Sequence, residues 1–231
     1  MTQIIIPYRP RQHFLQLHNS GRRHKFIVAH RRAGKTVALV NEMIRAALRN
    51  PRRDPHPRYA YIGPSFRQTK DLAWSYLKNF TAPFRGMPGY KVAEGELKVT
   101  LPTGATVTLY GGDRSWESLR GLYLDGAVLD EYAMLNPSML SDVIRPAVAD
   151  YKGFICASGT SNGDDHFHEL KKRVASDPAW DTFVIPVTET DALDPEELRE
   201  MTRDMTPEAY AREMLCSFSA PVEGAYYGDL I

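Results

Sequence analysis

Short apolar runs alternate along the chain with segments that repeat apolar residues at helical spacing. The runs are rich in β-branched and aromatic residues, and Gly, Pro, Asn and Asp punctuate the segments between them. This alternation predicts an α/β domain with a mostly parallel sheet flanked by helices. The expected strands are Lys25–Ala29, Tyr59–Gly63, Gly126–Asp130, Gly153–Ser158 and Thr182–Val187, and the expected helices are Lys35–Leu48, Phe66–Phe80, Asp164–Ala175, Pro195–Asp204 and Pro207–Cys216.

The middle of the chain carries a different strand pattern. Leu97–Leu101 and Thr106–Tyr110 flank Pro102-Thr-Gly-Ala105, whose proline and glycine are turn residues, so we expect a β-hairpin there. Near the end, Ala220-Pro-Val-Glu-Gly224 has the composition of a linker. We therefore expect one domain over residues 1–220 and the start of a linker at residues 221–231.

Composition and charge add limited detail. The chain has 231 residues, 43% of them hydrophobic and 25% charged, which is typical of a globular protein. Residues 1–85 contain 17 Lys/Arg against 3 Asp/Glu, although the whole chain carries only +1. Either this basic half faces phosphates of a nucleotide or nucleic acid, or the two halves pair electrostatically after folding.

Several classes of protein are disfavoured by the same composition. No apolar run is long enough to span a bilayer, and the N-terminus lacks the charged lead of a secretory signal, so we expect a cytoplasmic protein without membrane contact. The two cysteines, Cys156 and Cys216, lie far apart and form no CxxC pair. Neither a zinc knuckle nor a disulfide framework is therefore indicated.

A candidate phosphate-binding loop, Ala29-His-Arg-Arg-Ala-Gly-Lys-Thr36, follows an expected strand and opens an expected helix. In a P-loop (Walker A motif), backbone N–H groups wrap the phosphates and the helix N-terminus faces their negative charge. Gly34 allows close backbone approach, Lys35 reaches the β- and γ-phosphates, and Thr36 directs its hydroxyl at Mg²⁺. Ala29 departs from the usual first glycine. The loop residues expected to bind ATP are His30, Arg31, Arg32, Ala33, Gly34, Lys35 and Thr36.

A second motif, Ala127-Val-Leu-Asp-Glu131, is an apolar run that ends in two carboxylates. Asp130 at the strand tip is expected to hold Mg²⁺, and Glu131 to polarise the attacking water. A strand end with two solvated acids is the alternative, and the P-loop upstream argues against it. Because a second carboxylate is provided for water, the pair indicates hydrolysis rather than nucleotide holding alone.

Two further segments can contact the nucleotide. Gln12 precedes the first strand, and its amide can bind an adenine edge with donor and acceptor together; the alternative is a surface glutamine at a helix start. Ala157-Ser-Gly-Thr-Ser-Asn-Gly163 ends a strand with small polar residues, as expected of a loop that senses the γ-phosphate. A plain strand-to-helix turn explains the second segment equally simply.

These motifs together resemble the large subunit of the tailed-phage terminase, the packaging ATPase. The resemblance rests on Gln12, on the arginine-rich loop His30–Thr36, on Tyr61-Ile-Gly-Pro-Ser-Phe-Arg-Gln68, on Ser118-Leu-Arg-Gly121 before Leu129-Asp-Glu131, and on Ser158-Gly-Thr-Ser161. It implies a P-loop ATPase of the ASCE (RecA-like) type, with ATP and Mg²⁺ as cofactors.

The resemblance also implies roles for particular residues. Arg31 matches the family's arginine four residues before the P-loop lysine, and Arg120 matches an arginine finger that acts on a neighbouring subunit's ATP. The glycine after Arg120 predicts a turn that places the guanidinium at the ligand-binding end of the sheet or on an exposed edge. The family's coupling motif corresponds to Ser158, Gly159, Thr160 and Ser161.

At the level of the assembly, the resemblance implies a homo-oligomeric ring that moves double-stranded DNA into a procapsid. The implied partners are a portal protein and a small terminase subunit, and the implied location is the cytoplasm of an infected bacterium, transiently at the procapsid portal. Members of the family usually carry a second domain with nuclease activity. We expect no nuclease activity in this chain. Asp164-Asp-His-Phe-His168 is interpreted as a helix start rather than a metal cluster, because its two histidines do not share a helix face.

Two other functions remain open at this stage. One is a helicase-like DNA translocase, although a full helicase core normally needs a second RecA-like domain that this length does not hold. The other is a nucleotide-regulated DNA-binding assembly module, which the basic segments suit but which Glu131 argues against. A switch GTPase is disfavoured because there is no Asn-Lys-x-Asp sequence to read guanine.

Overall fold

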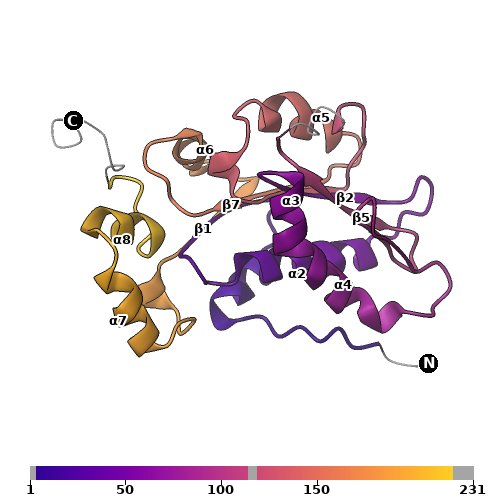
Figure 1. The fold of residues 1–231 in the computed structure, drawn as a ribbon. Coiled ribbons are helices and arrows are strands. Elements are labelled where there is room, and N and C mark those ends of the chain that lie inside the picture. The colour runs from indigo at the N-terminus through magenta and orange to yellow at the C-terminus, as the bar shows by residue number, and fades with distance from the viewer. Residues whose placement is uncertain (1–3, 114–118, 221–231) are drawn as a thin grey trace. The chain divides into compact units, whose positions relative to one another are not determined.

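The computed structural model describes residues 4–113 and 119–220 (Figure 1). Within them the strands are β1 (His24–Ala29), β2 (Arg58–Gly63), β3 (Lys91–Ala93), β4 (Lys98–Thr100), β5 (Thr106–Gly111), β6 (Gly126–Leu129), β7 (Phe154–Gly159) and β8 (Trp180–Ile185). The α-helices are α1 (Leu15–Asn19), α2 (Lys35–Arg49), α3 (Phe66–Thr69), α4 (Ser75–Thr81), α5 (Arg145–Ala147), α6 (His166–Val174), α7 (Pro195–Arg203) and α8 (Pro207–Glu213).

The strands form an eight-stranded sheet in the order β3-β4-β5-β2-β6-β7-β1-β8. β2 pairs in parallel with both β5 and β6, and β1 pairs in parallel with β8. β3 and β4 add an antiparallel edge, and the pairing of β4 with β5 is the hairpin that the turn residues predicted. The expected fold class, a mostly parallel sheet with flanking helices, is confirmed.

The chain is divided into two compact units. Of the described residues, unit 1 comprises 4–10, 36–113, 119–130 and 134–156, and unit 2 comprises 11–35, 131–133 and 157–220. In unit 1, α2 and α5 lie on opposite sides of the strands (Figure 1). Helix α2 buries Leu39, Met43 and Ile44 completely, which is the i, i+4 and i+5 spacing of one helix face.

Unit 2 is built around aromatic packing between β1 and α6. The ring of Phe26 on β1 stacks on that of Phe167 at 4.5 Å between centroids, and Phe218 packs against Phe167 at 5.6 Å. Asp165 caps α6 by accepting hydrogen bonds from the N–H groups of Phe167 and His168. The interpretation of Asp164–His168 as a helix start is confirmed.

Several elements differ from the expectations. The helix expected over Phe66–Phe80 is α3, a π-helical turn at Lys70–Trp74, and α4 in succession. The expected strand Thr182–Val187 begins earlier and ends at Ile185, because Pro186 has no N–H to donate. β3, α1, and the helical segment formed by Leu140–Ile144 and α5 were not expected; β3 has only three residues, too few to show alternation.

The structure also bears on the expectations for the cysteines and for membrane-spanning segments. Both cysteines are buried and free. Across the described parts of the chain, the helices are all too short or too polar to cross a membrane. Ser118 and the linker expected at residues 221–231 lie outside the described residues.

Candidate functional site

The expected phosphate loop lies where β1 ends and α2 begins. β1 is buried along its whole length, and the chain then turns through left-handed conformations at Arg32 (φ 70°) and Gly34 (φ 98°). Lys35 is only 8% exposed, and its Nζ donates a hydrogen bond to the carbonyl of Ala29 at 3.1 Å. The loop therefore has the strand–turn–helix form of a phosphate cradle, with an ammonium group held inside it.

Arg11 braces this loop, a contact that sequence motifs did not reveal. Its Nη1 donates to the carbonyl oxygens of Arg32 at 3.0 Å and Ala33 at 2.9 Å. His13 Nε2 lies 3.0 Å from the same Ala33 oxygen. A Cβ added to Gly34 would stand 3.5 Å from Arg11 Nη1, in contact but without a clash. The cost of a side chain at Gly34 therefore comes from its positive φ rather than from crowding.

In unit 1, the first helix turn meets the end of β6. Thr36 Oγ1 lies 3.4 Å from Asp130 Oδ2, and the Tyr61 hydroxyl donates a hydrogen bond to the same carboxylate oxygen. Asp130 is 2% exposed. A buried carboxylate beside a threonine hydroxyl offers the hard oxygen ligands that Mg²⁺ prefers, so these residues fit the expected ion.

In unit 2, the residue before Thr36 and the residue after Asp130 form a second pair. Lys35 Nζ lies 3.9 Å from Glu131 Oε1. The Glu131 Oε2 atom is 3.4 Å from both the backbone nitrogen and the hydroxyl of Thr160. Glu131 has a φ of 49°, an uncommon conformation for a residue that is not glycine. Such an outlier directly after a buried strand is typical of functional sites.

The expected coupling segment extends from β7 toward Glu131. Ser158 is fully buried and Gly159 ends the strand, while Ser161 donates a hydrogen bond to the carbonyl of Ser217. A Cβ on Gly159 would lie 3.3 Å from the Phe167 ring. The segment is thus packed on one side and in contact with the candidate base through Thr160 on the other.

Gln12 lines a hollow of about 410 Å³ within unit 2. The other lining residues include His13 and Gln16, the β8 residues Thr182 to Ile185, and Glu189, Thr190 and Asp191. The phosphate loop is close by, because His30 Nε2 lies 2.8 Å from Thr190 Oγ1. The hollow is large enough for a nucleobase and offers both donors and acceptors.

His30 and Arg31 both contact residues outside the phosphate loop. Burial lowers the pKa of His30 below 6.5, and the charge of Lys35 acts in the same direction. Arg31 donates from Nη1 to Glu213 Oε2 at 2.9 Å, and its backbone nitrogen donates to the Glu213 carbonyl at 3.0 Å. Arg31 is therefore engaged with the end of α8, and Arg32 beside it is exposed.

Arg120 lies at the other end of the sheet from Asp130. It precedes β6, whereas Asp130 follows β6, and the four residues of that strand span about 13 Å. Arg120 is exposed and lines a hollow of about 430 Å³ with Tyr123, Asp142 and Asp150 among others. The expected turn is present, since the Leu122 nitrogen donates to the Leu119 carbonyl at 3.2 Å. Of the two placements expected for this arginine, the structure has the exposed one and not the ligand-binding end.

Sequence reasoning missed Arg11 and Tyr61. Arg11 directly precedes Gln12, but nothing in its local pattern distinguishes it from the other arginines near the N-terminus. Tyr61 contacts Asp130 because β2 and β6 are adjacent, with Ile62 opposite Leu129. Only the strand order brings that hydroxyl to the motif, so a single-sequence pattern carries no signal for it.

Comparison with known proteins places this geometry in context. The family model described as "Terminase large subunit, T4likevirus-type, N-terminal" matches residues 26–228. A search of curated proteins gave no match.

Solved structures share the fold at low sequence identity. The large terminase ATPase domain of Thermus phage P74-26 superposes with a TM-score of 0.75 at 20% identity, covering 92% of this chain and 95% of that chain. The large terminase of a thermophilic bacteriophage in complex with ADP has a TM-score of 0.74 at 15% identity, covering 90% and 53%. The large terminase of bacteriophage HK97 has a TM-score of 0.68 at 15% identity, covering 87% and 48%. The chain spans about half the length of these last two proteins.

Proposed function

We propose that this chain hydrolyses ATP to drive double-stranded DNA into a procapsid. The proposal starts from its family: the chain belongs to the T4-like-virus-type terminase large subunits and matches their N-terminal part. One observation carries the proposal. Consecutive residues of the two motifs form two contacts, Thr36 with Asp130 and Lys35 with Glu131. The first pair has the groups that bind Mg²⁺, and the second has a phosphate-binding ammonium and a base for water. ATP hydrolysis needs both.

The charged and polar residues of the two motifs have different proposed roles. Lys35 and the N-terminus of α2 bind the β- and γ-phosphates, and Thr36 and Asp130 hold Mg²⁺, which neutralises phosphate charge when it is bound. Glu131 accepts a proton from the attacking water. Because Lys35 lies within 3.9 Å of Glu131 here, phosphate binding must draw the ammonium away and free the carboxylate for that water.

Thr160 is suited to report hydrolysis. Its backbone nitrogen and hydroxyl both approach Glu131, so a change in the protonation of that carboxylate alters the bonds available to the Ser158–Ser161 segment. We assign these four residues to coupling, since the hydrogen bond from Ser161 to Ser217 connects them with the rest of unit 2.

Arg120 is proposed to act on the ATP of a neighbouring subunit in a homo-oligomeric ring. Its place before β6 keeps it away from Asp130 of its own subunit, and its exposure suits contact with another. An arginine finger supplied this way contributes about 10³–10⁵ in rate. Arg31 remains the candidate for charge neutralisation within one subunit, which requires it to leave Glu213.

The proposed partners follow from the packaging role. They are double-stranded DNA, a portal protein and a small terminase subunit, in the cytoplasm of an infected bacterium and at the procapsid portal. Contacts to DNA should be made to phosphates rather than bases, because a packaging motor must accept any sequence.

The test of this function is the ATPase rate of the chain alone, with double-stranded DNA, and with DNA and portal. We expect stimulation by DNA and portal, and loss of turnover in Lys35→Ala. A chain that binds ATP but shows the same negligible rate under all three conditions would support a nucleotide-regulated assembly module instead.

Gln12 is proposed to read adenine within its hollow. Gln12→Ala should weaken ATP binding about tenfold while leaving GTP binding nearly unchanged, because one or two hydrogen bonds to the base are lost. Parallel binding titrations with both nucleotides check this. Equal losses for ATP and GTP would make Gln12 a surface residue without a role in base recognition.

We also propose that this chain does not cleave DNA. Among residues 4–113 and 119–220, no three His, Cys, Asp or Glu side chains are grouped to hold a metal ion. Plasmid DNA incubated with the purified chain and Mg²⁺ or Mn²⁺ should stay intact. Nicking that disappears when an acidic residue of this chain is mutated would contradict the proposal.

A further inference from the structure

The segment that carries Arg120 is a tight turn between two anchors. Leu119 is fully buried on one side, and Arg120 and Gly121 are exposed at the tip. Gly121 has a φ of 80°, and a Cβ placed on it would meet no atom within 4 Å. Gly121 therefore has open space beside it, and the chain enters and leaves the tip through Leu119 and Tyr123.

Tyr123 holds the chain on the far side of the turn. The Arg58 guanidinium lies 4.4 Å from the centroid of its ring and the Arg52 guanidinium 5.4 Å from it, both within range of cation–π attraction. Arg52 also lies over the Tyr151 ring at 3.7 Å, and the rings of Tyr123 and Tyr151 meet edge to face at 5.2 Å. The ring is thus fixed by partners from two other parts of the chain.

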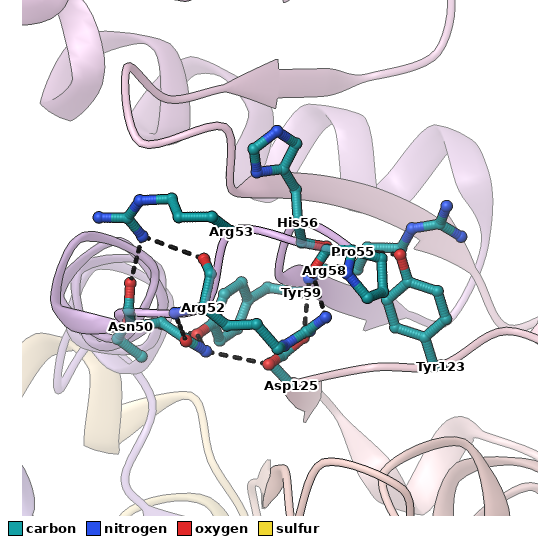
Figure 2. Close-up of polar contacts among 10 residues, drawn as sticks. Asn50, Arg52, Arg53, Pro55, His56, Arg58, Tyr59, Tyr123 and Asp125 are labelled. Carbon is teal, nitrogen blue, oxygen red and sulfur yellow. Dashed lines mark hydrogen bonds and ion pairs between the residues drawn. The ribbon is translucent and has the colours of Figure 1, made fainter.

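Asp125 fixes the arginines in turn. Its side chain is 5% exposed and forms an ion pair with Arg52. It also accepts hydrogen bonds from Asn50 Nδ2 at 2.9 Å and from the backbone N–H of Arg58 at 3.0 Å. Figure 2 shows Arg52 and Asp125 pointing toward each other, with Arg58 and Tyr123 beside them. Arg53, in contrast, turns back to the carbonyls of Asn50 and Arg52.

Stability alone is a poor explanation for this cluster. A buried ion pair contributes little compared with apolar packing of the same volume, although it can specify one geometry. In the described structure Arg52 Nε is buried without a hydrogen-bond partner, so the pair is not even fully satisfied. What the cluster does provide is a rigid mount for the residues that directly follow Arg120.

We propose that Tyr123, held between Arg52 and Arg58, is a positioning residue that orients Arg120 for its action on the neighbouring subunit. This inference rests on the proposed function. A reacting geometry displaced by about 1 Å can cost on the order of 10²-fold in rate, so a loosened turn should slow hydrolysis without weakening nucleotide binding. The guanidinium would still be present but would spend little time at the γ-phosphate.

The experiment uses the chain assembled with portal and DNA. Tyr123→Ala should lower kcat by about 10- to 100-fold and leave the KM for ATP nearly unchanged. Tyr123→Phe is the matched control, because it keeps the ring and removes a hydroxyl that is 3.5 Å from the His56 carbonyl. It should retain kcat close to that of the unchanged chain.

Rings assembled from two different variants distinguish a positioning role of Tyr123 from misfolding of the Tyr123→Ala subunit. Tyr123→Ala subunits retain Glu131, so they should recover turnover next to Glu131→Gln subunits, which supply an intact Arg120. Arg120→Ala subunits are mixed with Glu131→Gln subunits in parallel. Rescue of Arg120→Ala supports the proposed finger. If Tyr123→Ala then keeps full kcat, or if it loses kcat and is not rescued, the positioning role is wrong while the proposed finger stands. If Arg120→Ala has full activity, or is not rescued in rings shown to be mixed, both proposals are wrong.

Discussion

Aspartates stand at both ends of β6, and their surroundings differ. Asp125, just before the strand, is bound by the guanidinium of Arg52 and the amide of Asn50. Asp130, just after it, is approached by the hydroxyls of Thr36 and Tyr61. Both residues as a whole are nearly buried, at 8% and 2% exposure.

The difference lies in what each set of partners permits. An arginine neutralises a carboxylate, which leaves it little capacity for another cation. Hydroxyl groups leave the negative charge in place, and they can turn aside or join a metal's ligands. The same residue type therefore serves as a structural anchor at the amino end of the strand and is the proposed metal ligand at the carboxyl end.

The largest expected effect concerns catalysis at the carboxyl end. Glu131→Gln removes the proposed base next to Asp130 but keeps its shape, so kcat should fall by about 10²–10⁴-fold while ATP still binds. Steady-state turnover and a nucleotide titration measure the two quantities. Asp125→Asn, the matched change at the amino end, should retain measurable turnover. Full activity in Glu131→Gln would remove the distinction between the two ends.

The next effect concerns stability at the amino end. Asp125→Asn leaves the Arg52 charge without its partner, and we expect a loss of about 3 kcal/mol in the free energy of unfolding. That corresponds to a Tm lower by roughly 6–12 °C for a chain of this size. Glu131→Gln should stay within about 0.5 kcal/mol of the unchanged chain. Similar thermal shifts in both variants would show that the two carboxylates are equally structural.

A double substitution sharpens the same point. Replacing Arg52 with Met in the Asp125→Asn background removes the unpaired charge, so the double variant should recover about 1 kcal/mol or more of the loss. Thermal or urea unfolding of the two single variants and the double variant completes the cycle. Additive losses would mean that Asp125 and Arg52 do not depend on each other.

The smallest effect is a pH dependence near the phosphate loop. Because burial lowers the pKa of His30, the folded protein binds that proton less tightly than the unfolded chain does. The stabilisation is complete above about pH 6.5 and is lost as the pH falls through the lowered value. In His30→Gln, the decrease in Tm between pH 7 and pH 5 should be smaller than in the unchanged chain. Parallel melting profiles for the two proteins would show that His30 does not titrate in this range.

Local patterns predicted the parts of the site that are local. The strand, loop and helix around Lys35 are at the expected positions, with β1 and α2 extending one residue beyond the expected limits. Asp130 and Glu131 follow a buried strand as expected. The roles assigned to these residues stay predictions, as do those of Gln12, Arg31 and Arg120.

Contacts between distant residues were not predictable in the same way. Arg52 and Asp125 are 73 residues apart and meet because β2 and β6 start side by side. The strand order that creates this neighbourhood depends on packing across the sheet, which single-residue preferences do not encode. The π-helical turn at Lys70–Trp74 shows the same limit, since its apolar spacing resembles that of an ordinary helix.

The pairing of β1 with β8 also bears on when the phosphate loop can form during synthesis. β1 is the first strand in the chain, yet its neighbours in the sheet are β7 and β8, and its register runs from His24 opposite Trp180 to Ala29 opposite Ile185. Closing so long a stretch of chain is slow compared with forming local contacts. A ribosome that adds about 5–20 residues per second therefore exposes the loop sequence many seconds before its strand can be completed. Nucleotide affinity should accordingly arise late, once the chain has emerged beyond Ile185.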